Sequence, residues 1–437
     1  FFVSNEAGLH VNPLGSVHLQ NGAMALRGSS MVRGGTIESA PGYYGNISLE
    51  GFAEIELRID QGGSVALRQH ILELAANRLV LDGPGSAITN DGDAPNLGSL
   101  WMRSELGSAD AEFVVSNLAT ASTRSFSLAT SGFTGGGQAR VDVRSGGTLT
   151  TDHLGVGRLV YDYGLGLNDD FPHPAEMNID GPGSKVTIRS GYQAHVGSTL
   201  ADPFDANQLG TGNLTNGGEL DVSEGTLFIN RLGIVNVDGG VLNAGPIVYD
   251  FHSQFNFISG TLSTTDDLLL DNTQLLGPTV DLPAGKHLAT TGTTTISAVG
   301  SRTLDGGSFK TSSLVIDPGG SFTFNSGSLE LTVGSLDFDN SGLLGATETI
   351  GANKSITIGG DVILASNAEV TLAVGALAAD SLRISGHLIY DGGTLAVAGL
   401  MDVFFGGRVF IANNRTLAPG ALITNFGRIE LGGGLAR

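Results

Sequence analysis

Acidic side chains are the residues of this chain whose type and spacing come closest to supporting chemistry. Asp169 and Asp170 lie in one stretch rich in Asp, Pro and aromatic residues, and Asp202 and Asp205 lie in a second stretch nearby. Carboxylate and carbonyl oxygens are the ligands that calcium takes in proteins. These four residues therefore predict a calcium site. Solvated acidic loops are the alternative, because neither the EF-hand spacing nor the calcium-binding nonapeptide repeat occurs.

The other reactive side chains form no catalytic pattern. The nine His residues are scattered singly, with no HExxH motif and no pair at metal-ligand spacing. There is no GxSxG nucleophile elbow. Enzymes that cleave polysaccharides with clustered carboxylates and basic residues are the nearest catalytic alternative, but the chain has only four Lys. The sequence predicts that the protein is not an enzyme and has no cofactor apart from the calcium.

The composition excludes several classes of protein and of partner. Of 437 residues, 67 are Gly, 41% are hydrophobic and 15% are charged. Those values exclude a coiled coil and a disordered tail, and the Gly residues lack the collagen period. The formal charge of −21 argues against a nucleic-acid partner, since phosphate backbones would be repelled. No run of 18 uncharged apolar residues occurs, so no membrane span is expected.

A short pattern of Gly, then Ser or Thr, then alternating apolar and polar residues recurs along the chain. Examples are GSVHL from Gly15, GTLTT from Gly147 and GTLFI from Gly225. Alternation with a period of two places one set of side chains on a buried face, as in a β-strand. Gly residues between these runs, as in Asp238-Gly239-Gly240, supply positive φ at corners. The sequence therefore predicts an all-β protein. Arg68 to Arg78, which could form a short helix, is predicted to be strand as well.

The spacing of the turns distinguishes a solenoid from a sandwich. Intervals of 7 residues (Gly320 to Gly327) and 20 residues (Gly240 to Gly260) recur. Three faces of about seven residues make a coil of roughly 21, the size of one coil of a three-sided parallel β-solenoid. We therefore predict a right-handed, three-faced parallel β-helix that forms an elongated rod. It is expected to be one continuous solenoid over residues 1–437, with loop excursions near 90–108, 161–176 and 197–210.

A longer motif resembles known repeats. LDGPGS from Leu81 and IDGPGS from Ile179 are each followed by a strand, and HVGS from His195 and GTGNLTNGGELDV from Gly210 follow the second copy. This series, over about residues 80–245, resembles the passenger repeats of bacterial autotransporters. It is also similar to the β-strand repeats of exported bacterial proteins with PEP-CTERM sorting tails. The resemblance implies a secreted or cell-surface bacterial protein. The sequence begins with Phe1 and not with Met, which is consistent with removal of an export signal.

Together, these features predict an exported, non-catalytic structural β-solenoid. In the favoured hypothesis, the chain is a homo-oligomer or homopolymer that builds a filament, sheath or surface layer. Open solenoid ends expose unpaired strand edges, and neither terminal sequence has a polar cap. The residues expected to carry this self-association are Phe1, Phe2, Val3, Ile429 and Leu431. The alternative is an adhesin-type rod that binds a glycan or a host surface through loops such as Tyr161–Glu176. A polysaccharide-active β-helix enzyme is a further, less favoured alternative.

Overall fold

The structure is a computed structural model of the 437-residue chain. It describes residues 2–3, 8–19, 22–26, 28–39, 45–49, 55–67, 72–75, 78–90, 99–103, 110–128, 138–157, 175–197, 210–272, 275–412 and 422–432. These residues contain strands and turns but no helix, and all pairings between their named strands for which a register is given are parallel. The chain divides into two compact units, Phe1–Ser263 (unit 1) and Thr264–Arg437 (unit 2). The predicted parallel β-solenoid is therefore confirmed within each unit. Its handedness, its overall rod shape and its continuity over 1–437 stay predictions.

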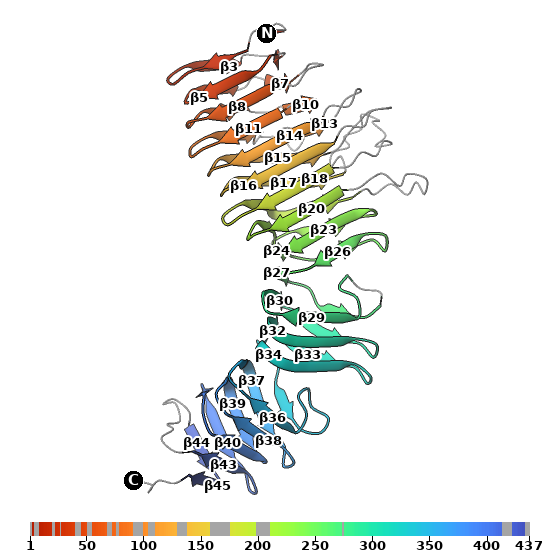
Figure 1. The fold of residues 1–437 in the computed structure, drawn as a ribbon, viewed down its shortest axis with the longest axis vertical. Helices are drawn as coiled ribbons and strands as arrows, with labels where there is room; N and C mark the ends of the chain where they lie inside the picture. The colour runs from red at the N-terminus through yellow and green to blue at the C-terminus, as the bar shows by residue number, and fades with distance from the viewer. Residues whose placement is uncertain are drawn as a thin grey trace. The chain divides into compact units, whose positions relative to one another are not determined.

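Unit 1 is a stack of coils whose strands form three parallel ladders (Figure 1). Ladder 1 contains β2 (His10–Val11), β5 (Ser30–Arg33), β8 (Glu56–Asp60), β11 (Arg78–Asp82), β14 (Ala111–Ser116), β16 (Ala139–Arg144), β18 (Ala175–Asp180), β20 (Gly210–Thr215), β23 (Gly233–Asp238) and β26 (Gln254–Phe257).

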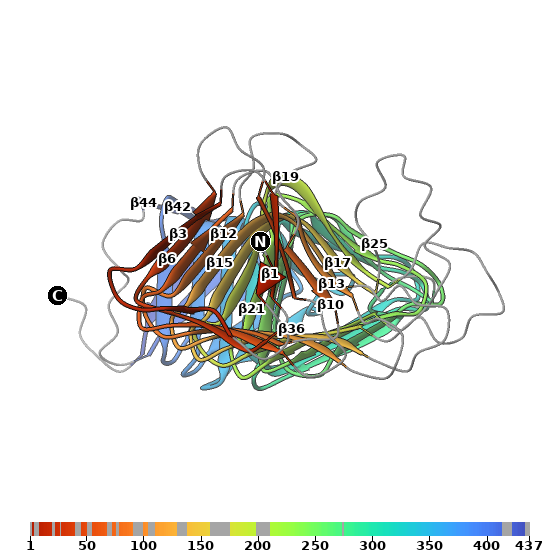
Figure 2. The same ribbon diagram turned by 90° about the horizontal axis from the view of Figure 1, so that it is seen from above.

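The other two ladders of unit 1 share three long strands, β15 (Thr120–Leu128), β17 (Thr148–Val156) and β19 (Lys185–Val196). Ladder 2 contains their first parts with β3 (Ser16–Leu19), β6 (Thr36–Ser39), β9 (Ser64–Ala66), β12 (Ala87–Asn90), β21 (Glu219–Val222), β24 (Gly240–Ala244) and β27 (Gly260–Thr264). Ladder 3 contains their last parts with β1 (Phe2–Val3), β4 (Gly22–Leu26), β7 (Gly45–Leu49), β10 (Leu72–Ala75), β13 (Ser99–Arg103), β22 (Thr226–Ile229) and β25 (Ile247–Tyr249). Seen from above, β3, β6, β12 and β15 stack along one side and β10, β13 and β25 along another (Figure 2).

The core of unit 1 is built by residues that repeat once per coil. In ladder 1 the buried side chains lie in register from strand to strand, so that each one packs on its equivalents in the coils before and after. One such row is Ile59, Leu81, Val115, Val143, Ile179, Leu214 and Val237. Burying a side chain of this kind contributes roughly 1.5–3 kcal/mol, so the row is a large part of what holds successive coils together.

The turn that leaves ladder 1 requires glycine. Between β20 and β21, Gly217 has a φ of +84°, which side chains with a Cβ rarely adopt. At Gly218 an added Cβ would lie 2.1 Å from the carbonyl oxygen of Ile179 in the preceding coil. The Gly-Gly corners predicted from the sequence are thus set both by backbone conformation and by the close approach of stacked coils.

Unit 2 is also built from stacked parallel strands, and two groups of them form sheets of their own. Two separate sheets are β28 (Leu268–Leu270), β31 (Thr293–Ile296) and β33 (Ser313–Ile316), and β36 (Thr347–Ile350), β38 (Glu369–Leu372), β40 (His387–Tyr390), β43 (Arg408–Ile411) and β45 (Arg428–Leu431). The remaining strands are β29 (Thr279–Pro283), β30 (Lys286–Thr290), β32 (Ser301–Thr311), β34 (Ser321–Leu331), β35 (Leu336–Phe338), β37 (Lys354–Leu364), β39 (Ala376–Ile384), β41 (Thr394–Val397), β42 (Leu400–Val403) and β44 (Leu422–Asn425).

Two local predictions can be compared with the strands. The stretch from Arg68 to Arg78 contains β10 and the start of β11, which confirms strand over helix for its described residues. The loop expected over 90–108 needs a correction, because β13 occupies its middle. There Leu100 and Met102 are fully buried, and β13 pairs with β10 and β15. The alternation of Leu100 and Met102 around Trp101 is a strand signal that the surrounding polar residues obscure.

Candidate binding face

The outer side of ladder 1 in unit 1 is a regular polar surface, which we call the ladder 1 face. In β8, β11, β14, β16 and β18, alternate residues point inward to the core and the residues between them point outward. Because the strands pair in register, outward side chains form rows that cross the coils. Three such rows carry most of the charged and amide groups of this face.

In the first row, acidic residues and arginines alternate from coil to coil. Arg78 donates from Nη1 to Glu56 at 2.8 Å and from Nε to Glu112 at 2.6 Å. Partial burial opposes the charge of Arg78, but the hydrogen bond to Glu112 and the contact with Glu56 outweigh it and raise the pKa of Arg78. The full row in register is Glu56, Arg78, Glu112, Arg140 and Glu176.

The second row ends in a ladder of amides. Asn178 donates to Asp142 at 2.9 Å, Asn213 donates to Asn178 at 2.8 Å, and Asn236 donates to Asn213 at 2.7 Å. Asn256 extends the series by donating to Asn236 at 2.7 Å. Each internal Asn therefore donates at least one hydrogen bond to the coil before it and accepts one from the coil after it. The amide ladder lies above the core and joins five coils of unit 1.

The third row contains carboxylates that arginines and hydroxyls hold in the charged form. Asp60 accepts from Arg33 at 3.1 Å and from Arg58 at 3.3 Å, and the hydrogen bond to Arg33 is the main cause of its lowered pKa. Arg58 also pairs with Asp82. Asp180 lies at the end of β18. It accepts a hydrogen bond from Thr215 at 2.6 Å, and this bond is the main cause of its lowered pKa.

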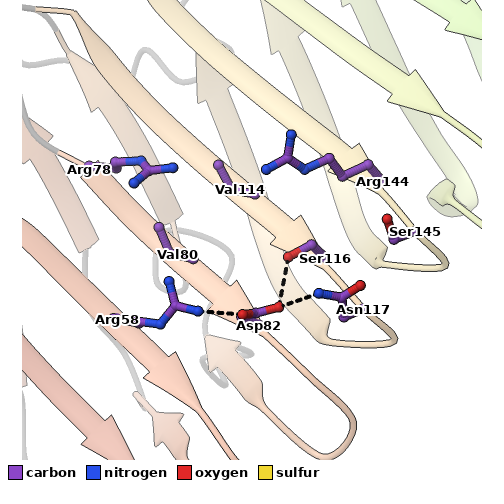
Figure 3. Close-up of a pocket in the computed structure, with 9 residues that line it drawn as sticks. All are labelled: Arg58, Arg78, Val80, Asp82, Val114, Ser116, Asn117, Arg144 and Ser145. Carbon is purple, nitrogen blue, oxygen red and sulfur yellow. Dashed lines mark hydrogen bonds and ion pairs between the residues drawn. The ribbon is translucent and has the colours of Figure 1, made fainter.

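A depression of about 330 Å³ interrupts the ladder 1 face over β11, β14 and their neighbours (Figure 3). Its floor is formed by Val80 and Val114, which are in register on adjacent strands. Asp82 lies at one side and accepts hydrogen bonds from Ser116 at 3.2 Å and Asn117 at 2.6 Å. The residues that line the depression are Arg58, Arg78, Val80, Asp82, Val114, Ser116, Asn117, Arg144 and Ser145.

Four titratable groups of the ladder 1 face are held in their charged form by their partners. A general acid or base works best with a pKa near the operating pH, whereas the pKa of Asp60 and Asp180 is lowered and the pKa of Arg33 and Arg140 is raised by their partners. Within the described ranges, no three His, Asp or Glu side chains gather closely enough to hold a metal ion. Those same ranges contain no helix with the length and apolarity needed to cross a bilayer.

The site residues predicted from the sequence lie elsewhere. Asp169, Asp170, Asp202 and Asp205 fall outside the described residues, so the calcium site stays a prediction. The strands that flank them can be placed: β17 and β19 pair with each other, and so do β18 and β20. The two acidic stretches therefore leave from neighbouring coils, as their nearness in sequence suggests.

The predicted self-association residues are described in part. Phe1 lies outside the described residues, and Phe2 and Val3 form β1, which pairs with β4. Ile429 and Leu431 lie in β45, which pairs with β43, and Leu431 is 52% exposed. Their role in association stays a prediction.

The ladder 1 face was not predicted from the sequence. Its signal was the recurrence of Asn at 178, 213, 236 and 256, and of acidic residues and Arg in alternation, at intervals that equal the coil lengths. Loop excursions make those intervals unequal, which hides the pattern until the register of the strands is known.

Comparison with known proteins assigns no family. No family model matches the sequence, and no curated protein matches it. Among solved structures, the chain is similar to the crystal structure of a TibA fragment, residues 55–350, hyper-glycosylated by TibC. Identity is 12%, the alignment covers 97% of this chain and 91% of that chain, and the TM-score is 0.21. A match at this level identifies no shared function.

Proposed function

We propose that this protein is an exported, non-catalytic β-solenoid that serves as a structural element at a bacterial cell surface or in a secreted fibre. The observation that carries the proposal is the use of charged and amide side chains on the ladder 1 face. Asn178 donates a hydrogen bond to Asp142, and Asn213 donates one to Asn178, so each of these bonds joins two neighbouring coils. Such bonds rigidify a stack, which is what a structural element requires. The motifs that resemble autotransporter passenger repeats support export.

Self-association is the finer part of this proposal, and its support is an exposed aromatic corner in unit 2. The aromatic corner consists of Phe404, Phe405 and Phe426. β42 and β44 pair in register up to Val403 and Asn425, so Phe404 and Phe426 follow at the same position of two successive coils. Phe405 is 95% exposed and Phe426 is 70% exposed. Clustered exposed apolar side chains are typical of interaction surfaces.

The occupant that we propose for this corner is a second copy of the chain. The uncovered side chains continue from the corner onto the last described strands, where Leu422 and Leu431 are also exposed. Within the described residues, β44 and β45 each pair on one side, with β42 and β43 respectively. A strand edge with apolar side chains beside it is a template for another strand. The same surface on a second copy of the chain would offer both a strand edge and exposed apolar side chains.

Sedimentation velocity and electron microscopy of the full chain test this proposal. We expect ordered fibres or arrays for the parent protein. The double variant F405S/F426S and the variant I429K/L431K should each shift the sedimentation distribution toward monomer, while the circular dichroism signal of β structure stays unchanged. Phe251→Ser is the matched control, because Phe251 is 83% exposed on a turn of unit 1. A parent protein that is dispersed and monomeric over a wide concentration range would show that the self-association proposal is wrong.

An adhesin-type role is the second candidate function. The observation that favours it is the length of two connections from ladder 3 to ladder 1. Val156 is followed by Ala175 at the next strand, and Val196 by Gly210, whereas Ile229 is followed by Gly233. Long connections on a regular scaffold are where binding loops usually occur. Replacing residues 161–173 with a Gly-Ser linker of equal length should abolish attachment to a cell or glycan surface if this candidate is correct.

A further inference from the structure

The floor of the depression on the ladder 1 face is formed where two Val residues interrupt a row of polar side chains. Along the second row, Arg58 precedes Val80 and Asp142 follows Val114, so two short apolar residues stand between longer polar ones. Val80 and Val114 point outward, yet they are only 4% and 1% exposed. Long arginine side chains line the same depression and cover such residues with their apolar stems. The result is a shallow apolar floor with a polar rim.

Three arginines form that rim, and they differ in how fully they are paired. Arg58 pairs with Asp60 and Asp82. Arg78 uses Nη1 and Nε for its two glutamates, which leaves Nη2 without an acceptor among the described residues. Arg144 is exposed and lies in register with Asp180, whose pKa it helps to lower, but it makes no hydrogen bond or close ion pair with any residue in the described ranges. Hydrogen-bond donors for a ligand are therefore available at two of the three guanidinium groups.

The guanidinium groups of Arg78 and Arg144 point toward the same part of the depression. In Figure 3, the guanidinium groups of Arg78 and Arg144 extend toward each other from opposite sides of Val114. Asp82 is already neutralised by Arg58 and by the donors Ser116 and Asn117. Arg58 and Arg78 are balanced by the carboxylates that they bind, so the unpaired guanidinium donors, and not a net positive charge, would recognise an anion here. Distant acidic groups are screened beyond about 8 Å at physiological ionic strength.

We propose that this depression binds an acidic sugar unit of a polysaccharide. Arg144 and the free Nη2 of Arg78 would hold the carboxylate or sulfate group of that unit, because guanidinium groups pair with planar and tetrahedral oxyanions through charge-assisted hydrogen bonds. The C–H face of the sugar ring would lie over Val80 and Val114, against the apolar arginine stems that cover them. The open, shallow form suits one unit of an extended chain that crosses the coils. This inference does not depend on self-association, and it assigns the ligand contact to the ladder 1 face and not to the loops.

Binding of the full chain to three polymers tests the proposal. The probes are polygalacturonate, which carries carboxylates, dextran sulfate, which carries sulfate esters, and neutral dextran. We expect binding to at least one of the two anionic polymers, and comparing the two shows which anionic group is recognised. Arg144→Gln should weaken that binding by about tenfold, equivalent to about 1.4 kcal/mol. Since the interaction of Arg144 with Asp180 is the smallest of the causes that lower the pKa of Asp180, this variant should nearly keep the melting temperature of the parent.

Arg383→Gln is the control for net charge. Arg383 lies on unit 2, pairs with Asp361 at 3.1 Å and has a half-exposed side chain. Val114→Glu provides a second, independent variant, because it fills the floor and adds repulsion. The proposal is overturned if neither anionic polymer binds, if dextran binds equally well, or if R144Q and R383Q reduce binding to the same extent. The last result would show that the polymer responds only to net charge.

Discussion

The guanidinium carbon of Arg302 lies 4.1 Å from the centroid of the Phe309 ring, inside the core of unit 2. Arg302 is 1% exposed and occupies an inward position in register with Val280 and Phe322. Its Nε, Nη1 and Nη2 atoms have no hydrogen-bond partner among the described residues. The ring face gives partial compensation for the charge, but a buried cation without an acceptor destabilises the coil that contains it.

Replacing Arg302 with Met should therefore stabilise unit 2. Met fills a similar volume without a charge, and removing buried ionic groups of this kind commonly stabilises a protein by about 1–4 kcal/mol. Differential scanning calorimetry of the full chain should show a higher melting temperature for the transition of unit 2. Arg383→Met is the control, since its exposed ion pair with Asp361 contributes about 1 kcal/mol or less. A lower melting temperature for R302M would mean that the guanidinium has a stabilising partner.

The same residue predicts an unusual dependence of stability on pH. Burial lowers the pKa of Arg302 from its ordinary value to about 9. Above pH 9 the folded state loses this proton before the unfolded state does, so the unfolded state binds more protons and stability rises with pH. The stability gap between R302M and the parent should be constant below pH 9 and should narrow above it by about 1.4 kcal/mol per pH unit. Urea unfolding of both proteins at pH 8 and pH 10 measures the gap, and a gap that does not narrow contradicts the prediction.

The amide ladder gives a third prediction. Asn213→Ala removes the hydrogen bonds to Glu176 and Asn178 and leaves the amide of Asn236 without its acceptor. We expect a loss of about 1–2 kcal/mol in the free energy of unfolding. Asn256→Ala, at the exposed end of the ladder, loses only the hydrogen bond to Asn236 and should cost less than about 0.5 kcal/mol. Chemical denaturation followed by circular dichroism compares the two. If both variants lose the same free energy of unfolding, the internal hydrogen bonds stabilise the protein no more than the bond of an exposed Asn does.

Close packing of the coils gives a fourth prediction. Gly218→Ala places a Cβ 2.1 Å from the backbone oxygen of Ile179, so one coil must shift away from its neighbour. The expected cost is about 2 kcal/mol or more. Gly351→Ala is the control, because no atom lies within 4 Å of its added Cβ. Thermal unfolding should separate the two variants clearly, and a G218A protein as stable as the parent would show that the coils can separate at little cost.

The fold could be predicted from the sequence because its signals are local. The alternation of Leu227 and Ile229 and the Gly-Gly corner at Gly217 and Gly218 each report on a few neighbouring residues, and the structure buries both side chains and places the turn there. Ladder 1 confirms the interval of about 20 residues per coil in its shortest case, Val237 to Phe257. Where a connection is long, the interval grows, as from Val143 to Ile179.

The candidate site could not be predicted in the same way, because it depends on register between coils. Arg78 and Arg144 are 66 positions apart and face each other only once two coils of unequal length are folded. Trp101 was missed as part of a strand because two inward residues are a weak signal. Arg302 was missed because no composition rule places an arginine in a core. These features follow from tertiary packing and not from local propensity.

The in-register rows of ladder 1 have a consequence for how such a gene can change. Each described coil presents equivalent residues to the coils before and after it, so the junction between any two coils resembles the next junction along the stack. Unequal recombination that adds or removes one whole coil leaves an equivalent junction behind it. The reach of the protein can therefore lengthen or shorten between lineages in steps of one coil, with no compensating substitutions in the interior.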